Sequence, residues 1–298
     1  MIKLAVISGK GGTGKTMVTA ALADLNQRSQ VLADCDVDAA NLQLLFQSQM
    51  ISREPFHGLE SAIIDASQCR ACGLCQELCR FGAIHNGGVY QVDRMHCEGC
   101  GVCENQCPEG AITMAKVQNG ELFVSETEKG TLVHARLFPG SGTSGLLVHK
   151  VKQKAEEMTP HPSWILVDGP PGTGCPLIST VSGMDAVLIV TEPSVSALHD
   201  LRRVVTVCRR FGPRIMVLIN RYDLEADVCQ QIHDYCDNQG LRVIAQLPFD
   251  PQVIEAVRKG MPITRFDSPA GKALLHIWED INSELVANER GRGEKPLP

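Results

Sequence analysis

The sequence has few aromatic residues, no long apolar run and no cluster of basic residues. Phe, Trp and Tyr make up 4% of the 298 residues, so aliphatic side chains must supply most of the core. The longest apolar runs, such as residues 186–190, are far shorter than the ~20 residues of a membrane span. The net charge is −6 and Lys and Arg are dispersed, so neither a membrane nor nucleic acid is expected as a partner.

Room for a signal peptide is also lacking, because the opening residues MIKLAVISG run straight into a predicted strand. We therefore expect a cytoplasmic protein. Cysteine is the exception in this composition: the chain has 13. In a cytoplasmic protein so many cysteines indicate metal binding or redox chemistry rather than disulfides.

Short β-branched segments alternate with amphipathic segments, which predicts an α/β fold with a doubly wound, mostly parallel sheet. The predicted strands are 2–8, 30–36, 163–169, 186–192, 214–220 and 242–249. Residues 121–137 predict a hairpin. The predicted helices include 144–158, 197–211 and 268–286.

The segment GKGGTGKT follows the first predicted strand and matches the P-loop pattern G-x-x-x-x-G-K-[ST]. We expect Lys15 to bridge the β- and γ-phosphates of ATP and the Thr16 hydroxyl to coordinate Mg²⁺. A chance glycine-rich turn is the alternative, and the strand before the motif and the helix after it argue against that. The predicted nucleotide-binding residues here are Gly9, Lys10, Gly11, Gly12, Thr13, Gly14, Lys15, Thr16 and Met17.

Lys10 is a second lysine at the mouth of the loop. It is either a solvated loop residue or a charge that reaches the nucleotide of a partner subunit. The segment KGGTGKT resembles the deviant P-loop of the MinD/ParA/Mrp/nitrogenase-iron-protein ATPases. The resemblance implies that ATP is bound between two subunits, with Lys10 crossing the interface of a homodimer or of a heterodimer with a related ATPase.

Two further segments carry the resemblance. Residues 33–41 resemble switch I, which implies that Asp36 positions the attacking water and that Asp34 lies near the metal shell. Residues 164–174 resemble a Walker B strand that runs into switch II, with Asp168 holding Mg²⁺ through water. These carboxylates end predicted parallel strands, where they meet the phosphate loop.

Two later residues are similar to the family's adenine-binding positions. Asn220 closes a predicted strand and matches the family's adenine-binding Asn. Pro248, in LPFD, matches the segment that flanks the base on its other side. The alternative for Asn220 is an ordinary turn residue at a strand end.

Eight cysteines form two runs, 69–84 and 97–112, each with the spacing C-x₂-C-x₂-C-x₃-C and each ending in G-A-I. This is the pattern of a bacterial ferredoxin with two [4Fe–4S] clusters, in which the fourth cysteine of each run binds the other cluster. A zinc site or disulfides are the alternatives, and the duplicated spacing disfavours both. One cluster is assigned to Cys69, Cys72, Cys75 and Cys107, and the other to Cys97, Cys100, Cys103 and Cys79.

These motifs divide the chain. Residues 1–58 and 117–287 form the predicted P-loop ATPase domain, and 59–116 form an inserted small α+β ferredoxin-like domain. Residues 288–298 are predicted to be a flexible tail.

Cys175 follows Asp168 at the offset of a cluster ligand in the nitrogenase iron protein. That protein needs a second cysteine per subunit, and the matching loop here, 139–145, contains none. We therefore expect Cys175 to be an exposed thiol near the dimer interface. The remaining cysteines are expected to be buried apolar residues: Cys35, Cys208, Cys229 and Cys236.

Three functions follow from this organisation. The first is an ATPase that couples nucleotide state to electron transfer through the two clusters, with a redox partner. The second is an iron–sulfur or metal-cofactor assembly or carrier ATPase, with a client protein. The third, a MinD/ParA-like positioning ATPase, ranks last because the C-terminal residues lack an apolar face. A purely structural role for the clusters is a further alternative.

Overall fold

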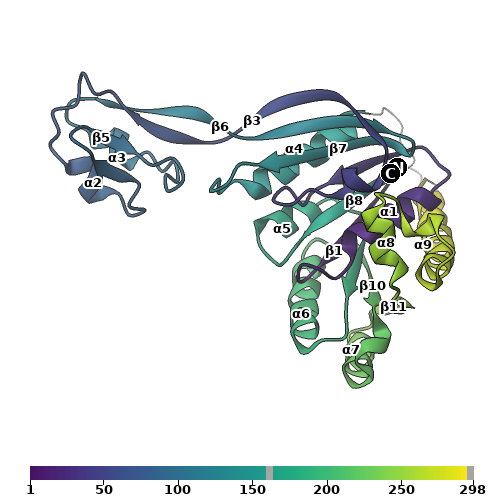
Figure 1. The fold of residues 1–298 in the computed structure, drawn as a ribbon. Helices are drawn as coiled ribbons and strands as arrows, with labels where there is room; N and C mark the ends of the chain where they lie inside the picture. The colour runs from purple at the N-terminus through teal and green to yellow at the C-terminus, as the bar shows by residue number, and fades with distance from the viewer. Residues whose placement is uncertain (159–163, 294–298) are drawn as a thin grey trace.

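The computed structural model describes residues 1–158 and 164–293, which are built around one large sheet (Figure 1). Its strand order is β11-β10-β9-β1-β8-β2-β7-β6-β3. The first seven of these strands are parallel, whereas β6 is antiparallel to both β7 and β3. The strands are β1 Ile2–Ser8, β2 Gln30–Asp34, β3 Ser48–Ile64, β6 Ile112–Thr127, β7 Gly130–Leu137, β8 Trp164–Pro171, β9 Ala186–Thr191, β10 Arg214–Asn220 and β11 Arg242–Leu247.

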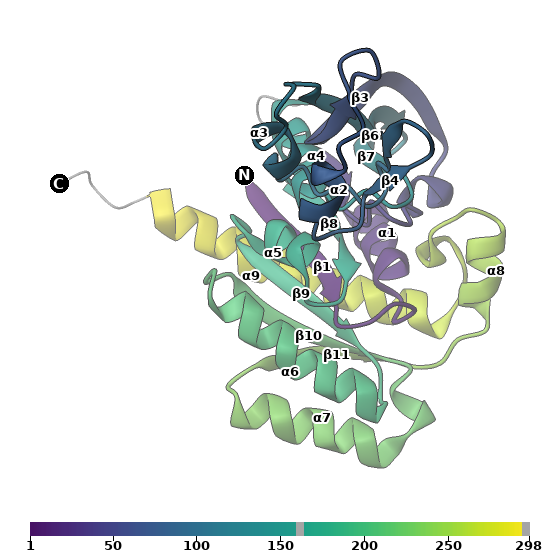
Figure 2. The same cartoon turned by 90° about the vertical axis from the view of Figure 1, so that its left-hand side faces the viewer.

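Helices cover both faces of the parallel part, as Figure 2 shows, so the predicted doubly wound α/β fold is confirmed. One face carries α1 (Lys15–Leu25), α8 (Gln252–Arg258), α9 (Pro269–Gly293) and the short 3₁₀ turns η1 (Leu42–Leu45) and η3 (Ile263–Arg265). The other face carries α4 (Ser144–Met158), α5 (Cys175–Val181), α6 (Val195–Arg209) and α7 (Ala226–Asn238). A further 3₁₀ turn, η2 (Tyr222–Leu224), precedes α7.

The core is aliphatic, as the low aromatic content predicts. The central strands are buried on both sides and consist almost entirely of Val, Ile, Leu and Ala. Trp164 and Trp278 are exceptions, with ring centroids 5.0 Å apart where β8 meets α9. Buried parallel strands of this kind place their C-terminal ends, and the loops that follow them, along one edge of the sheet.

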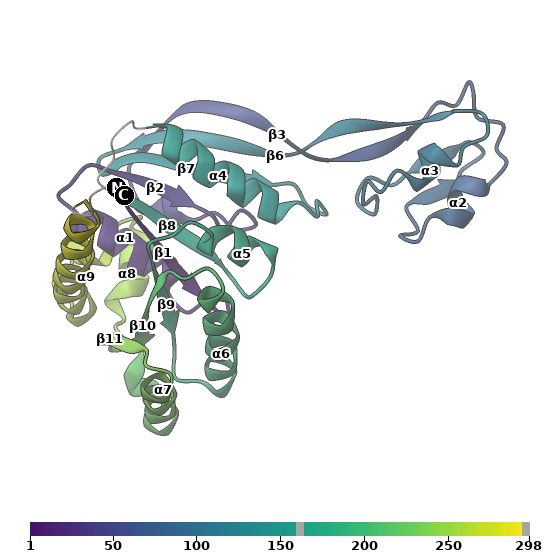
Figure 3. The same cartoon turned by 180° about the vertical axis from the view of Figure 1, so that it is seen from behind.

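The strands β3 and β6 form a two-stranded ribbon that projects from the sheet, and Figures 1 and 3 show a small lobe at its tip. The ribbon pairs Ser48 with Thr127 at its base and Ile64 with Ile112 at its tip. The lobe, residues 65–111, contains all eight cysteines of the two runs. Its elements are α2 (Leu74–Leu78), β4 (Ile84–Asn86), β5 (Tyr90–Val92) and α3 (Val102–Asn105).

The strand β3 is not predicted from the sequence, because most of its residues are exposed and it has no apolar face to create an alternating pattern. The predicted hairpin at 121–137 corresponds to the β6–β7 turn, but β6 extends much further. The predicted domain boundaries at residues 58 and 116 fall inside the ribbon, close to where Glu60 pairs with Lys116.

The closing helix α9 extends past its predicted end at residue 286, as far as Gly293. Ala287, directly after the predicted end, has the highest helix propensity of all residues, so no stop signal lies at that point. The last part of the predicted tail, 294–298, and the start of the strand predicted at 163–169 lie outside the described residues. Across the described ranges, every helix is too short or too polar to cross a bilayer.

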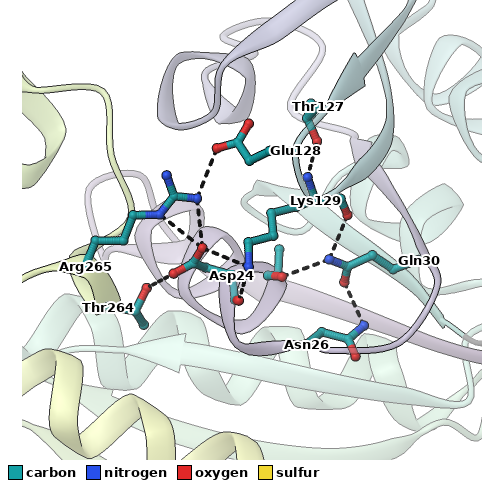
Figure 4. Close-up of polar contacts among 9 residues, drawn as sticks. Asp24, Asn26, Gln30, Thr127, Glu128, Lys129, Thr264 and Arg265 are labelled. Atoms are coloured by element: carbon teal, nitrogen blue, oxygen red, sulfur yellow. Dashed lines mark hydrogen bonds and ion pairs between the residues drawn. The ribbon is translucent and has the colours of Figure 1, made fainter.

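A polar network at the edge of the sheet opposite the P-loop ties three segments together (Figure 4). Asp24, near the end of α1, accepts hydrogen bonds from Thr264 at 2.5 Å and from Arg265 at 2.8 Å, and its carboxylate lies 3.2 Å from the Lys129 ammonium. Arg265 also pairs with Glu128 at 3.0 Å. The β6–β7 turn and η3 are thereby fixed to α1.

Candidate functional site

The P-loop joins β1 to α1 and wraps around the N-terminus of that helix. Gly12 and Gly14 have φ angles of +81° and +97°, which favour glycine strongly. At Gly14 a Cβ would also lie 2.6 Å from the Asn220 side-chain nitrogen. Lys15, the first residue of α1, is only 6% exposed. Free backbone N–H groups and a buried ammonium therefore converge on one anion-binding position.

The predicted Mg²⁺ residues lie in contact. The Thr16 hydroxyl donates to Asp168 Oδ2 at 2.6 Å, and the Thr19 hydroxyl lies 3.0 Å from Oδ1. Burial raises the pKa of Asp168 to about 6, although Thr16 and Lys15 oppose the shift. A buried carboxylate beside a hydroxyl and a phosphate loop is a donor set that fits Mg²⁺, since oxygen ligands are what this ion prefers.

The switch I carboxylates have different surroundings. Asp34 pairs in register with Asp168 across β2 and β8 and is fully buried. It accepts hydrogen bonds from the backbone N–H groups of Asp36 at 3.1 Å and Leu42 at 3.0 Å. Burial and the charge of Asp168 raise its pKa well above the ordinary value. Asp34 therefore shapes the loop after β2.

Asp36 is only half-buried and lies at the mouth of the site. Burial raises its pKa above the ordinary value, Lys15 opposes the shift and Asp38 adds to it. Its role in positioning the attacking water stays a prediction.

Lys10 contacts its own chain. Its ammonium lies 2.7 Å from Glu192 Oε1 and within 3.3 and 3.4 Å of the Ser194 and Ser196 hydroxyls. Its role across a dimer interface stays a prediction. Ser8, at the end of β1, donates to the Lys10 carbonyl at 2.6 Å and fixes the backbone of the loop.

The predicted base-binding residues lie at the ends of β10 and β11. Asn220 is buried and donates a hydrogen bond to the Thr13 carbonyl at 2.8 Å, so it supports the P-loop from the side. Pro248 follows Leu247, the register partner of Asn220, and is half-buried. The Met17 side chain packs in the core, so only its backbone N–H is free to face a phosphate.

Two cavities in the lobe are each lined by three cysteines of one run and one cysteine of the other. The first is lined by Cys69, Cys72, Cys75 and Cys107, and the second by Cys97, Cys100, Cys103 and Cys79. This is the grouping that the two-cluster pattern requires. The roles of these residues as ligands stay a prediction.

The lobe is duplicated in structure as well as in sequence. The backbone N–H of Asp65 donates to Ala111 at 2.8 Å, and that of Asp93 donates to Ala83 at 2.7 Å, so each run packs on the end of the other. Helices α2 and α3 each follow a glycine with positive φ. This exchange brings the fourth cysteine of each run to the other run's cavity.

Each of the two cavities is lined by four cysteines, the number of thiolates that hold a [4Fe–4S] cluster. Within residues 1–158 and 164–293, no group of three or more His, Cys, Asp or Glu side chains is gathered tightly enough for one metal ion. In a cubane each thiolate binds a different iron, so four ligands surround a cluster rather than a point. The Ala83 N–H donates to the Cys79 sulfur at 3.4 Å.

Cys175 is exposed and begins α5, while Cys35, Cys208, Cys229 and Cys236 are buried as expected. The loop 139–145 does approach it, because a Cβ on Gly145 would lie 3.1 Å from the Cys175 Cβ. This loop supplies no second thiol. Cys175 is therefore a single exposed thiol on the ATPase body, and its place at a dimer interface stays a prediction.

Sequence reasoning misses two residues of the nucleotide site. Thr19 lies three residues after Thr16, so the helical period places both hydroxyls on the face toward Asp168. This spacing is a usable signal. Glu192 directly follows β9 at the same edge of the sheet, but its contact with Lys10 depends on the loop conformation.

The fold and the P-loop geometry define a P-loop ATPase. Residues 4–263 match the family model described as the CobQ/CobB/MinD/ParA nucleotide binding domain. The chain therefore belongs to this family, and the resemblance read from KGGTGKT is confirmed.

Three curated relatives align over nearly the whole chain. The uncharacterized protein MJ0578 of Methanocaldococcus jannaschii is 30% identical, and the alignment covers 94% of this chain and 96% of that protein. An iron–sulfur cluster carrier protein of Pyrococcus furiosus is 26% identical, with coverage of 95% and 86%. The septum site-determining protein MinD of Thermotoga maritima is 25% identical, with coverage of 96% and 90%.

The solved structure of MinD with Mg-ADP from Pyrococcus horikoshii superposes with a TM-score of 0.56. Its sequence is 20% identical, and the match covers 94% of this chain and 95% of that chain. At this level of identity the comparison shows the shared fold alone.

Proposed function

We propose that this chain is an ATP-hydrolysing iron–sulfur protein in which a dimer, closed by ATP, couples nucleotide state to electron transfer through two [4Fe–4S] clusters. The observation that carries the proposal is the pair of four-cysteine cavities on a ribbon that begins close to switch I. Two cavities with complete ligand sets in one small lobe suit resident clusters that pass electrons to a redox partner.

In the ATPase reaction, water attacks the γ-phosphorus and the bond to the ADP oxygen breaks. Lys15 and the P-loop N–H groups bind the phosphates, while Thr16 and Asp168 hold Mg²⁺. Asp36 orients the water. Lys10 neutralises charge on the nucleotide of the partner subunit, which is either a second copy or a related ATPase.

Asn220 and Pro248 flank the adenine in this proposal. The buried amide of Asn220 already contacts the P-loop through Thr13, so one residue reads the base and holds the loop. Base binding and phosphate binding would therefore be linked through this side chain.

When bound, each cluster supplies a site that accepts and releases one electron. The cysteines hold it. The second cavity is otherwise lined largely by apolar side chains, among them Leu78, Phe81, Ile84, Val92 and Met114. Such a lining lowers the local dielectric and, with N–H donors to sulfur, sets the potential of the site.

The ribbon supplies a route between the two halves. The segment from Asp36 to the start of β3 contains the switch I loop and η1, and β6 returns to the sheet through β7, whose neighbour is β2. Movement of switch I therefore acts on the base of the ribbon. A physical route supports coupling, but only a nucleotide-dependent change at the lobe demonstrates it.

A second function, an iron–sulfur cluster carrier that delivers to a client protein, is favoured by the relatives. The Pyrococcus furiosus relative and a second one from Pyrococcus abyssi are both named iron–sulfur cluster carrier protein. In that case the bound iron is cargo and must leave easily, with Cys175 as a transient ligand.

Anaerobic EPR of the iron-reconstituted, reduced protein separates the two functions. Spectra are recorded with ATP, with a non-hydrolysable analogue and without nucleotide, alongside iron transfer to an apo-ferredoxin. The Asp168→Asn variant is the control with impaired nucleotide hydrolysis. Electron transfer predicts spectra or potentials that shift with nucleotide while iron stays bound. If the spectra are the same with and without nucleotide while iron is transferred to the apo-ferredoxin, the electron-transfer proposal is overturned in favour of the cluster carrier.

A further inference from the structure

Glu192 lies between two cations at the edge of the nucleotide site. Its Oε1 is 2.7 Å from the Lys10 ammonium, and its Oε2 is 3.1 Å from an Arg221 guanidinium nitrogen. The carboxylate is only 17% exposed, against 32% for Lys10 and 37% for Arg221. It is therefore the most enclosed member of a three-residue ion cluster.

The surrounding backbone holds Glu192 in this position. The residue directly follows β9, between β1 and β10, and its carbonyl accepts the N–H of Ser194 at 2.8 Å. Ser194 in turn caps α6 by accepting from Ala197 at 3.3 Å. With the Ser196 hydroxyl, these groups form a preformed receptor for the Lys10 ammonium.

Arg221 gives the cluster a second property. If Lys10 leaves, the Glu192 carboxylate keeps a cationic partner, so no enclosed charge is left unpaired. Arg221 holds a left-handed backbone conformation, with φ of 54°, directly after Asn220. The arrangement therefore tolerates two states of Lys10, one bound and one released.

We propose that Glu192 is a positioning residue that retains Lys10 in its own subunit until the partner's nucleotide competes for it. This inference rests on the proposed role of Lys10 across the dimer. A γ-phosphate adds negative charge at the interface, so ATP draws Lys10 away from Glu192 more strongly than ADP does. Glu192 thus opposes closure without ATP and makes closure depend on the γ-phosphate.

Amine labelling of the nucleotide-free protein tests the retention directly. The full chain and its Glu192→Gln variant are treated with trinitrobenzenesulfonate, and the modification rate of Lys10 is measured by mass spectrometry. We expect Lys10 to react about threefold faster in the variant, as for loss of a partly exposed ion pair. The matched control is Glu156→Gln, which removes the 2.6 Å partner of Lys3 and should accelerate Lys3 alone. An unchanged Lys10 rate overturns the proposal.

Measurement of dimerisation tests whether Glu192 opposes closure of the dimer. By sedimentation velocity with a non-hydrolysable ATP analogue, Glu192→Gln should lower the dimer dissociation constant about tenfold, because two such contacts open per dimer. Glu192→Asp, which keeps the charge, should lie between this variant and the wild type. The Glu192→Asp variant also provides the test if the Glu192→Gln protein fails to fold. A weaker dimer in both variants would show that Glu192 assists closure and would overturn the proposal.

The Lys10→Ala background separates the possible failures. There, Glu192→Gln should not restore ATP-dependent dimerisation, since the group it acts on is gone. If Lys10→Ala alone leaves ATP-dependent dimerisation and hydrolysis intact, the proposed role of Lys10 fails. If Lys10→Ala abolishes both while Glu192→Gln changes neither labelling nor dimerisation, only the role of Glu192 fails.

Discussion

The hydroxyl of Thr19 lies 3.0 Å from Oδ1 of Asp168, on the carboxylate oxygen that Thr16 does not contact. The same hydroxyl lies 3.0 Å from the Lys15 carbonyl. The two threonines, one helical turn apart, therefore clamp both oxygens of the carboxylate. This fixes the direction in which Asp168 faces the predicted Mg²⁺ position.

Thr19→Val should weaken Mg²⁺ use without removing the P-loop. Loss of one hydrogen bond to a buried carboxylate costs about 1–2 kcal/mol, so we expect the apparent KM for Mg²⁺ in the ATPase assay to rise about three- to tenfold. The control is Thr206→Val, which removes a similar hydroxyl that bonds only the Arg202 carbonyl on α6. Equal effects of the two variants would mean that the carboxylate contact is irrelevant.

Gly14→Ala should remove nucleotide binding. The substitution forces a side chain into a φ of +97° and places its Cβ 2.6 Å from the Asn220 amide, which also holds Thr13. We expect ATP affinity by calorimetry to fall more than about tenfold and stability to fall by about 2 kcal/mol or more.

Gly212→Ala is the matched control for this change. Gly212 has φ of +71° and open space around it, so only the backbone strain of about 1 kcal/mol applies. ATP affinity should be unchanged. A loss of affinity at Gly14 no larger than at Gly212 would argue against a packed P-loop.

His134 should make the protein less stable as the pH falls from 6.5 toward 4. It stacks on Phe123 with ring centroids 4.9 Å apart, and burial lowers its pKa to about 4 from an ordinary 6.5. The folded form therefore stays neutral while the unfolded form takes up a proton, so stability present above pH 6.5 is lost through this window.

Chemical unfolding at several pH values checks this, with His134→Phe compared against wild type. The difference between them should shrink or reverse in favour of the variant as the pH falls. Asp168 and Asp34, whose pKa values are raised, act in the opposite direction and cancel in the comparison. His149→Asn, at an exposed position, should leave the pH dependence unchanged.

The sequence predicts the parts of this molecule whose patterns are local. The strand 2–8, the P-loop and the helix 144–158 are all found at or within a residue of their predicted bounds. Each is encoded by a continuous apolar pattern or by glycines at fixed spacing.

The sequence does not predict the features that depend on contacts between distant segments. The ribbon strand β3 has no apolar face, so its order comes from pairing with β6 rather than from burial. Glu192 is an ordinary residue after a strand until the loop conformation brings Lys10 to it. The position of a side chain in a loop is set by the whole edge of the sheet, and no local pattern records it.

Asp24→Ala should destabilise the fold without changing ATP hydrolysis. The network in Figure 4 loses the acceptor shared by Thr264, Arg265 and Lys129, far from the P-loop. We expect the free energy of unfolding to fall by about 2–3 kcal/mol, as for partly buried charged groups left without a partner. The pKa of Asp24 is lowered chiefly by Arg265 and Thr264, against the opposing and largest single effect of burial.

The comparison for this variant is Asp267→Ala. Asp267 pairs with Lys272 at 2.6 Å but is 88% exposed, so its loss should lower the free energy of unfolding far less than the loss of Asp24. Urea unfolding measures both. If both variants lose a similar free energy of unfolding, the network of Asp24 contributes no more than a surface ion pair.

Cys107→Ala should remove the cluster that belongs to the other cysteine run. Cys107 lies in the second run, but it lines the cavity that contains Cys72 and Cys75. After reconstitution, iron content should fall by about half, because one of two clusters is lost. The surviving EPR signal should match that of Cys72→Ala and differ from that of Cys103→Ala, whose residue lines the other cavity.

Comparison of these EPR spectra shows which run supplies the fourth cysteine ligand of each cluster. If each run closed its own cluster, Cys107→Ala would instead give the spectrum of Cys103→Ala, its neighbour in sequence. The crossover is favoured because Asp65 and Asp93 each bond the end of the opposite run, which carries the fourth cysteine across. Loss of all iron in any single variant would mean that the two sites fold as one unit, and the lobe would then need both clusters to hold its shape.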